Sequence, residues 1–316
     1  MYSRIMVPLD GSAFAEAALP YALALAGRWR AAVELVTVND AESGGGGRSM
    51  AEGSAERQMG AEYLASVLER IRTSGYRGKF ESALVTGGEV VPRLVERLRN
   101  SAADFVVMTT HGRGPVRRAW LGSRADGFLR CTPVPVLLIR PTGEDAATGE
   151  DAVPGDEPSR TDLSHLPPPF KRVLLPLDGS PEAERLLEIA APLASGSDTE
   201  VLLLRAVPPF IPCGSPYVPH VVRGAEEETM VTAAAQEYLD ALATRVPVGR
   251  VVTRVTTIGQ PALAILDVAE EEGADLIAMS TAGRGGVSRM LLGSVADKVI
   301  RGSAVPVLLY RYAPEA

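Results

Sequence analysis

The residue types best suited to ligand chemistry occur in two acidic turns and two glycine-rich segments. The acidic turn, Asp-Gly-Ser, stands at residues 10–12 and again at 178–180. The glycine-rich segments run from Thr109 to Gly114 and from Ser280 to Gly286. Glycine lets backbone N–H groups approach a ligand closely, and a carboxylate accepts hydrogen bonds from hydroxyl groups. The combination favours a ligand that carries an anionic group and a sugar.

A Gly-Ser pair follows each glycine-rich segment, at Gly122-Ser123 and at Gly293-Ser294. Each pair is predicted to begin a helix, and a helix N-terminus offers unpaired N–H groups with a partial positive charge. The serine adds a hydroxyl, and Arg113 and Arg284 in the glycine-rich segments add positive charge. A diphosphate or triphosphate fits this arrangement. The alternative is that each segment is only a tight turn before a helix.

The nucleoside end of such a ligand is expected beside the acidic turns. The carboxylates of Asp10 and Asp178 are expected to accept hydrogen bonds from ribose hydroxyls. Backbone groups at Val38 and Val207, where the predicted second strands end, are expected to hold the edge of a base. The alternative for each acidic turn is structural: its serine caps the helix that follows.

The chain consists of two copies of one sequence pattern. Residues 4–12 read RIMVPLDGS and residues 172–180 read RVLLPLDGS, an offset of 168. Near the end of each copy, residues 134–140 read VPVLLIR and residues 305–311 read VPVLLYR, an offset of 171. Because the offset changes by only three residues, the two halves are expected to be two domains of the same fold.

Each copy alternates apolar strand patterns with helix patterns, which indicates the α/β class and a mostly parallel sheet. The fold is expected to comprise two tandem doubly wound domains, each a five-stranded sheet with helices on both faces. The strands expected before the last ones are 5–9, 32–38, 79–86 and 104–109, and 173–177, 200–207, 250–257 and 275–280. The helices expected are 13–28, 51–73 and 89–100, and 181–194, 225–245 and 261–272, with a fourth beginning at each Gly-Ser pair.

The boundaries predicted are a first domain at 1–140, a linker at 141–169 and a second domain at 170–312. The linker is acidic and holds six of the 24 prolines, which favours an extended segment over a packed one. The net charge of −7 argues against a nucleic-acid binder. No apolar run is long enough for a membrane helix, and two cysteines cannot build a disulfide framework. A cytoplasmic location is therefore expected.

At these positions the chain resembles the universal stress protein family, and the resemblance covers both copies. The opening strand of that family is similar to V-P-L-D-G-S, as residues 7–12 read here. ATP-binding members carry G-x2-G-x9-G-[ST] after the fourth strand, but Thr109 and Ser280 replace its first glycine here. The remaining motif positions match at Gly112, Gly122 and Ser123 and at Gly283, Gly293 and Ser294. By the same resemblance, nucleoside contacts fall at Asp10, Val38, Asp178 and Val207.

The resemblance implies a cytoplasmic stress-response protein that binds ATP, ADP or AMP, with Mg²⁺ as an accompanying ion, in one or both copies. No catalytic residue and no protein metal site is assigned. Two alternatives stay open: an interaction protein of the same fold that binds no nucleotide, and a slow Mg²⁺-dependent ATP hydrolase. The resemblance also implies that residues 134–140 and 305–311 pair, giving an intramolecular pseudo-dimer. A homodimer of whole chains is left open.

The two copies are expected to differ in affinity. The stretch after the second strand holds Gly44–Gly47 in the first copy and five prolines between Pro208 and Pro219 in the second. A stiffer loop loses less entropy on ordering, and the second copy keeps Gly286 where the first has Pro115. Tighter binding is therefore expected in the second copy.

Overall fold

A computed structural model describes residues 1–39, 50–110, 122–140, 161–194, 198–207, 225–247, 250–257, 260–281 and 292–311. The chain forms two units. The first comprises residues 1–169, 290–292 and 306–316, and the second comprises residues 170–289 and 293–305. The last strand of the second copy is thus grouped with the first unit.

The first unit contains a sheet in the order β3-β2-β1-β4-β5-β10. Its strands are β1 (Arg4–Pro8), β2 (Ala32–Asn39), β3 (Phe80–Thr86), β4 (Phe105–Thr109), β5 (Val136–Ile139) and β10 (Val307–Tyr310). Its helices are α1 (Ala13–Glu16), α2 (Leu19–Trp29), α3 (Met50–Thr73), α4 (Val90–Asn100) and α5 (Ser123–Cys131). The first five strands are parallel, whereas β10 runs antiparallel to β5, with Leu308 opposite Leu137. The expected pairing of the two last strands is therefore present.

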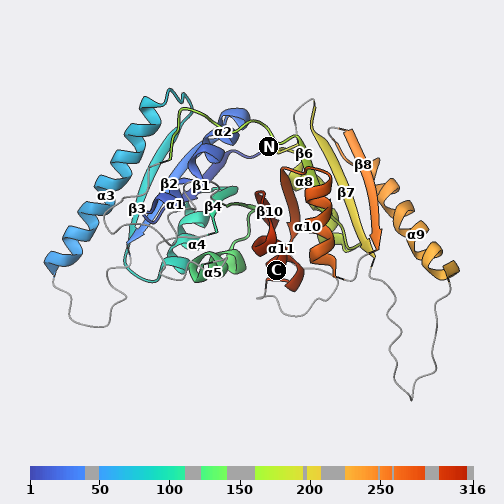
Figure 1. Ribbon diagram of the computed structural model, residues 1–316. Coiled ribbons are helices and arrows are strands. Elements are labelled where there is room, and N and C mark those ends of the chain that lie inside the picture. Colours follow the sequence, from blue (N-terminus) through green and yellow to red (C-terminus); the bar gives the residue numbers. More distant parts are fainter. Residues whose placement is uncertain are drawn as a thin grey trace, which may run out of the picture. The chain divides into compact units, whose positions relative to one another are not determined.

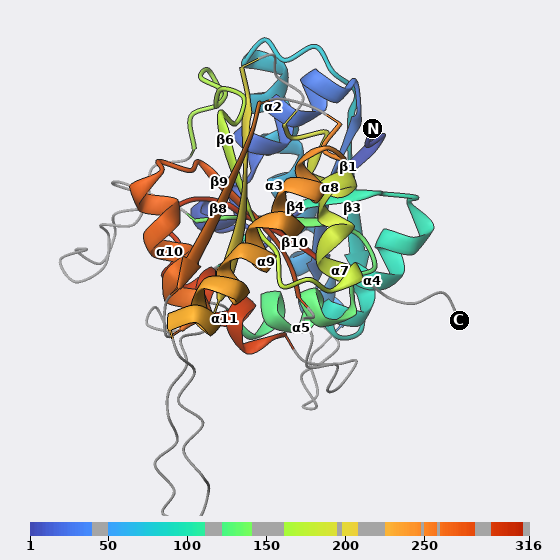
Figure 2. The same ribbon diagram turned by 90° about the vertical axis from the view of Figure 1, so that its right-hand side faces the viewer.

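The second unit repeats this order in the sequence β9-β6-β7-β8, again with parallel neighbours. Its strands are β6 (Arg172–Pro176), β7 (Glu200–Val207), β8 (Arg250–Thr257) and β9 (Leu276–Ser280). Its helices are α7 (Pro181–Glu184), α8 (Leu186–Ala190), α9 (Ala225–Ala243), α10 (Pro261–Glu271) and α11 (Ser294–Gly302). Helix α9 packs along β7 and β8, while α10 and α11 pack against each other (Figures 1 and 2).

The strand order makes each unit doubly wound, as expected. The chain runs from β1 outward through β2 to β3 and then returns past β1 to β4. Because parallel crossovers are right-handed, α1 to α3 cover one face of the sheet and α4 and α5 cover the other. The order reverses between β1 and β4, and between β6 and β9 in the second unit. Open α/β sheets bind ligands at this switch point, outside the carboxyl ends of the strands.

The first helix of each copy is shorter than expected. The helix predicted over 13–28 is divided into α1 and α2, because Pro20 stands at the start of α2 and has no N–H to continue the ladder. The helix predicted over 181–194 is divided into α7 and α8 and ends at Ala190. Pro192 follows two residues later and has no backbone N–H to continue the hydrogen-bond ladder of the helix.

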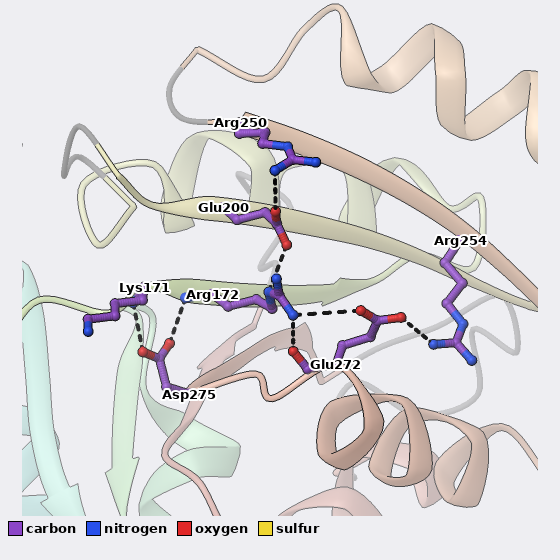
Figure 3. Close-up of polar contacts among 7 residues, drawn as sticks. All are labelled: Lys171, Arg172, Glu200, Arg250, Arg254, Glu272 and Asp275. Atoms are coloured by element: carbon purple, nitrogen blue, oxygen red, sulfur yellow. Dashed lines mark hydrogen bonds and ion pairs between the residues drawn. The ribbon is translucent and has the colours of Figure 1, made fainter.

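At the end of each sheet where the parallel strands begin, one carboxylate joins the two central strands. Asp104, just before β4, accepts hydrogen bonds from the backbone N–H groups of Ser3 (2.8 Å) and Arg4 (2.9 Å) at the start of β1. Asp275 does the same in the second unit, with Lys171 (2.7 Å) and Arg172 (3.0 Å) (Figure 3). These bonds fix the central strands side by side, and so fix the carboxyl ends that meet at the other edge.

A chain of ion pairs extends this anchor in the second unit. Arg172 contacts Glu200 at 2.7 Å and Glu272 at 3.6 Å, and Arg250 contacts Glu200 at 3.7 Å (Figure 3). Arg254 joins Glu272 from β8. The charges alternate in sign along the chain of contacts, so each carboxylate is shared between two guanidinium groups.

The two copies differ in one buried pair of residues between the second strand and the helix that precedes the fourth strand. Glu34 in β2 is fully buried and accepts from the Arg97 guanidinium of α4, with Nε at 2.7 Å from Oε1. The strand registers and the offset of 171 make Leu202 and Val268 the equivalent residues in the second unit, and both are buried. One copy therefore fills this space with a charged pair and the other with an apolar pair.

The matched positions predict the effect of exchanging one pair for the other. Arg97→Val alone leaves the Glu34 carboxylate buried without its cation, which is expected to lower the free energy of unfolding by about 3 kcal/mol. The double change Glu34→Leu with Arg97→Val recreates the second copy and is expected to be neutral or stabilising. Urea denaturation measures the change, and amide hydrogen exchange in β2 and α4 locates it. A double variant as unstable as the single one would contradict the prediction.

Candidate functional site

The acidic turn after β1 is held by hydrogen bonds among its own residues. The Oδ1 atom of Asp10 accepts from the Ser12 backbone N–H at 3.0 Å and from the Ser12 hydroxyl at 2.5 Å. The Ser12 Oγ in turn accepts from the Ala15 N–H at 3.1 Å and so caps α1. Gly11 lies between them with φ of 82°, a conformation that side-chain-bearing residues rarely adopt. The spacing Asp-Gly-Ser is thus required by the turn itself.

The second copy builds the same turn after β6. Asp178 Oδ1 accepts from the Ser180 N–H at 2.9 Å and from its hydroxyl at 2.5 Å. Ser180 caps α7 through the Ala183 N–H at 3.2 Å, and Gly179 has φ of 80°. The structural interpretation of the two serines is confirmed. Each turn also leaves a half-buried carboxylate at the carboxyl end of a central strand.

A backbone hydrogen bond closes each glycine-rich segment at its base. The Gly122 N–H donates to the Thr110 carbonyl at 3.0 Å, and the Gly293 N–H donates to the Thr281 carbonyl at 2.9 Å. The bond brings the end of β4 to the start of α5, and the end of β9 to the start of α11. The segments in between lie outside the described residues, and so do the predicted site residues Gly112, Arg113, Gly283 and Arg284.

The helices after these segments begin without a side-chain cap, in contrast to α1 and α7. Gly122 and Gly293 are the N-cap residues, and neither has a side chain that could accept from the first turn. Ser123 and Ser294 open the helices, and both are exposed. As predicted, each Gly-Ser pair begins a helix. Its exposed first turn presents N–H groups and the positive end of the helix dipole, which suits an anion.

The switch point brings these features to one edge of each sheet. Strand β1 pairs with β4 through Ile5 and Phe105, so Asp10 and Thr109 follow neighbouring strands at the same end. Thr109, at the first motif position, is buried with 5% of its surface exposed, whereas Ser280 is half-buried. Thr109, which replaces the first motif glycine, therefore has its side chain buried within the protein in the first copy.

The registers show which residues of the two second strands are equivalent. Arg4 lies opposite Ala32 and Arg172 opposite Glu200, so the offset between β2 and β7 is 168. The residue equivalent to Val38 is therefore Ala206, and Val207 is equivalent to Asn39. Because side chains alternate along a strand, Val207 projects to the opposite face from the Val38 equivalent. Both predicted residues do lie at the carboxyl ends of the second strands.

A second cluster beside each acidic turn was missed by sequence reasoning. In the first unit Glu16 of α1 is buried and contacts the Arg70 guanidinium of α3 at 2.6 Å. In the second, Glu184 of α7 contacts Arg245 at 2.7 Å and accepts from the Tyr238 hydroxyl of α9 at 3.3 Å. The available signal was a tyrosine seven residues before an arginine in each copy: Tyr63 and Arg70 within α3, and Tyr238 within α9 with Arg245 just after the helix end.

The tyrosines of these clusters report on the charge at the site. Burial raises the pKa of Tyr63, and the carboxylates of Glu16 and Asp10 raise it further. In the second unit burial, together with the Glu184 and Asp178 carboxylates, raises the pKa of Tyr238 to about 12, although the Arg205 guanidinium opposes the shift. Each tyrosine hydroxyl thus lies in the field of the acidic-turn carboxylate of its own unit.

Within the residues that the structure describes, no group of three or more His, Cys, Asp or Glu side chains is arranged to hold a metal ion. No helix in the same residues is long and apolar enough to cross a membrane.

The fold and the site together define a class of protein: tandem, doubly wound α/β chains with a glycine-rich segment after each fourth strand. The profile of the Universal stress protein family matches residues 1–140 and 169–311. The chain belongs to the universal stress protein family.

Individual relatives and solved structures are similar to this chain over different lengths. A universal stress protein of Mycobacterium tuberculosis strain H37Rv is 30% identical over 225 residues, which cover 70% of this chain and 65% of the relative. The crystal structure of a universal stress protein from Archaeoglobus fulgidus has a TM-score of 0.66 and 20% identity, and the likeness covers 98% of both chains. A universal stress protein solved in complex with cAMP has a TM-score of 0.34 and 23% identity over 46% of this chain and 98% of its own.

The two N-cap glycines provide a matched test of the segment closure. A Cβ added to Gly293 would lie 2.8 Å from the Thr281 carbonyl oxygen, while one added to Gly122 would lie 3.8 Å from that of Thr110. Gly122→Ala is expected to cost about 1 kcal/mol, the usual effect of alanine at an N-cap. Gly293→Ala is expected to cost roughly 1–3 kcal/mol more, because the clash opens the closing bond. Thermal unfolding of both variants measures this, and equal costs would contradict it.

Proposed function

We propose that this protein is a stress-response nucleotide-binding module, in which each repeat takes ATP, ADP or AMP at its switch point. The observation that carries the proposal is the uncapped helix N-terminus held against the end of the fourth strand by the closing hydrogen bond. That bond occurs in both units, from Gly122 to Thr110 and from Gly293 to Thr281. Phosphate groups are the ligands that this arrangement of N–H groups suits best.

The nucleoside is proposed to lie between the acidic turn and the end of the second strand. Asp10 and Asp178 are half-buried carboxylates on the neighbouring central strand, at the same edge of the sheet as the phosphate end. They are proposed to accept hydrogen bonds from ribose hydroxyls. The backbone at Val38, and at Ala206 or Val207 in the second repeat, is proposed to hold the base. Ser123 and Ser294 would add hydroxyl donors to the phosphates.

The ligand set suits binding better than rapid chemistry. The acidic-turn carboxylates already accept hydrogen bonds from their own serines. We propose that Mg²⁺ accompanies the phosphates, because hard cations commonly bind through phosphate oxygens with one or two carboxylates. A cytoplasmic location and a pseudo-dimer built on the β5–β10 pairing complete the proposal.

Two glutamate substitutions test the proposal through opposite effects on stability and binding. Ser123→Glu and Ser294→Glu place a carboxylate on the exposed first turn of α5 and α11, where it interacts favourably with the helix dipole. The unliganded protein is expected to gain roughly 0.3–1 kcal/mol per site in unfolding free energy. The same charge repels phosphate, so the affinity for ATP measured by titration calorimetry is expected to fall at least about tenfold.

The control is the neutral pair Ser123→Gln and Ser294→Gln, which has nearly the same size without the charge. These variants are expected to keep most of the ATP affinity of the unmodified chain. If the glutamate variants bind ATP as the glutamine variants do, phosphate does not lie at the helix N-termini. If the unmodified chain gives no heat with millimolar ATP, with or without Mg²⁺, the nucleotide-binding proposal fails.

A further inference from the structure

The two candidate sites differ by one charged side chain at the carboxyl end of the second strand. The strand registers make Arg205 of β7 equivalent to Thr37 of β2. Thr37 is buried, and its hydroxyl has no hydrogen-bond partner among the residues that the structure describes. The first copy thus has a small neutral side chain where the second has a guanidinium.

Arg205 reaches from β7 toward the end of β6. Its Nη1 atom donates to the Leu177 carbonyl at 2.9 Å, and Leu177 immediately precedes Asp178 in the acidic turn. Its guanidinium carbon lies 5.6 Å from the centre of the Tyr238 ring on α9. The side chain is therefore held between two elements at the edge where the nucleotide is proposed to bind, with a fixed direction.

The charge balance beside the two sites differs as a result. Among the described residues of the first unit, Asp10 and Glu16 lie near the Arg70 guanidinium. In the second unit Asp178 and Glu184 lie near Arg245 and, in addition, near Arg205, which stands where the first unit has the neutral Thr37. A negatively charged ligand is repelled less at the second site than at the first. This difference in repulsion between the two sites grows with each added negative charge on the ligand.

We propose that Arg205 is a specificity-determining residue that makes the second repeat the one selective for the more highly charged nucleotide. This inference rests on the proposed nucleotide site and adds a preference that the two copies do not share. The second repeat prefers ATP to AMP more strongly than the first does when Mg²⁺ is absent, because the Arg205 cation offsets the nearby carboxylates.

The experiment uses the full chain with one site silenced. In the Ser123→Glu chain, nucleotide binding reports on the second repeat, and in the Ser294→Glu chain it reports on the first. Titration calorimetry with ATP and with AMP, in EDTA, gives the ratio of the two dissociation constants for each repeat. The ratio is expected to favour ATP roughly fivefold more at the second repeat than at the first, the effect of one partly screened charge.

Variants at Arg205 separate its charge from its hydrogen bond. Arg205→Gln in the Ser123→Glu chain keeps a donor for the Leu177 carbonyl but removes the charge, and is expected to lower the ATP preference roughly fivefold. Arg205→Lys keeps the charge and is expected to retain the preference. Thr37→Arg in the Ser294→Glu chain is expected to raise the preference of the first repeat. Melting temperatures without nucleotide identify any variant that is merely misfolded.

The outcomes distinguish this inference from the proposed function. Binding by the unmodified chain with the same ATP-to-AMP ratio in the Arg205→Gln and parent chains overturns the role of Arg205 and leaves the nucleotide site standing. Absence of binding by the unmodified chain overturns both. A preference lost in Arg205→Gln and kept in Arg205→Lys, at similar melting temperatures, establishes the charge of Arg205 as its cause.

Discussion

The hydrogen bond from the Gly122 amide to the Thr110 carbonyl sets the geometry on which the candidate site depends. It brings the start of α5 to the end of a buried strand, and the same bond joins Gly293 to Thr281 in the second unit. Without it the first turn of the helix would not have to face the switch point. With it, the N–H groups of the first helical turn lie at the carboxyl ends of the strands, while the acidic turn supplies a carboxylate on the neighbouring strand.

The two copies keep this frame and differ in the polar groups around it. The buried Glu34–Arg97 pair of the first unit is replaced by apolar residues in the second, so neither solution is required by the fold. Buried charges of this kind contribute little net stability because desolvation offsets their attraction. Charges at the sheet edge differ more freely, as Thr37 and Arg205 illustrate. Duplication has therefore preserved the backbone geometry of the site while its electrostatics diverged.

Much of this arrangement could be predicted from the sequence. The repeated Asp-Gly-Ser turns and Gly-Ser pairs located the ends of strands and the starts of helices, because each residue type has a local backbone role there. The strand registers were not evident from the sequence, and they make Ala206, beside the predicted Val207, the equivalent of Val38. Arg205 gave no signal, because only three-dimensional contacts with Leu177 and Tyr238 show where an isolated arginine at a strand end is directed.

The antiparallel pairing of β10 with β5 has a consequence for the order of folding. The last strand of the chain completes the edge of the first unit, and it pairs with residues about 170 positions earlier. During synthesis the first copy therefore emerges with an apolar strand, Val136–Ile139, that pairs with β4 on one side while its partner on the other side, β10, has not yet been made. Such distant contacts slow folding, and an uncovered strand edge invites pairing between nascent chains. Synthesis of β10 is thus coupled to protection of the β5 edge against aggregation.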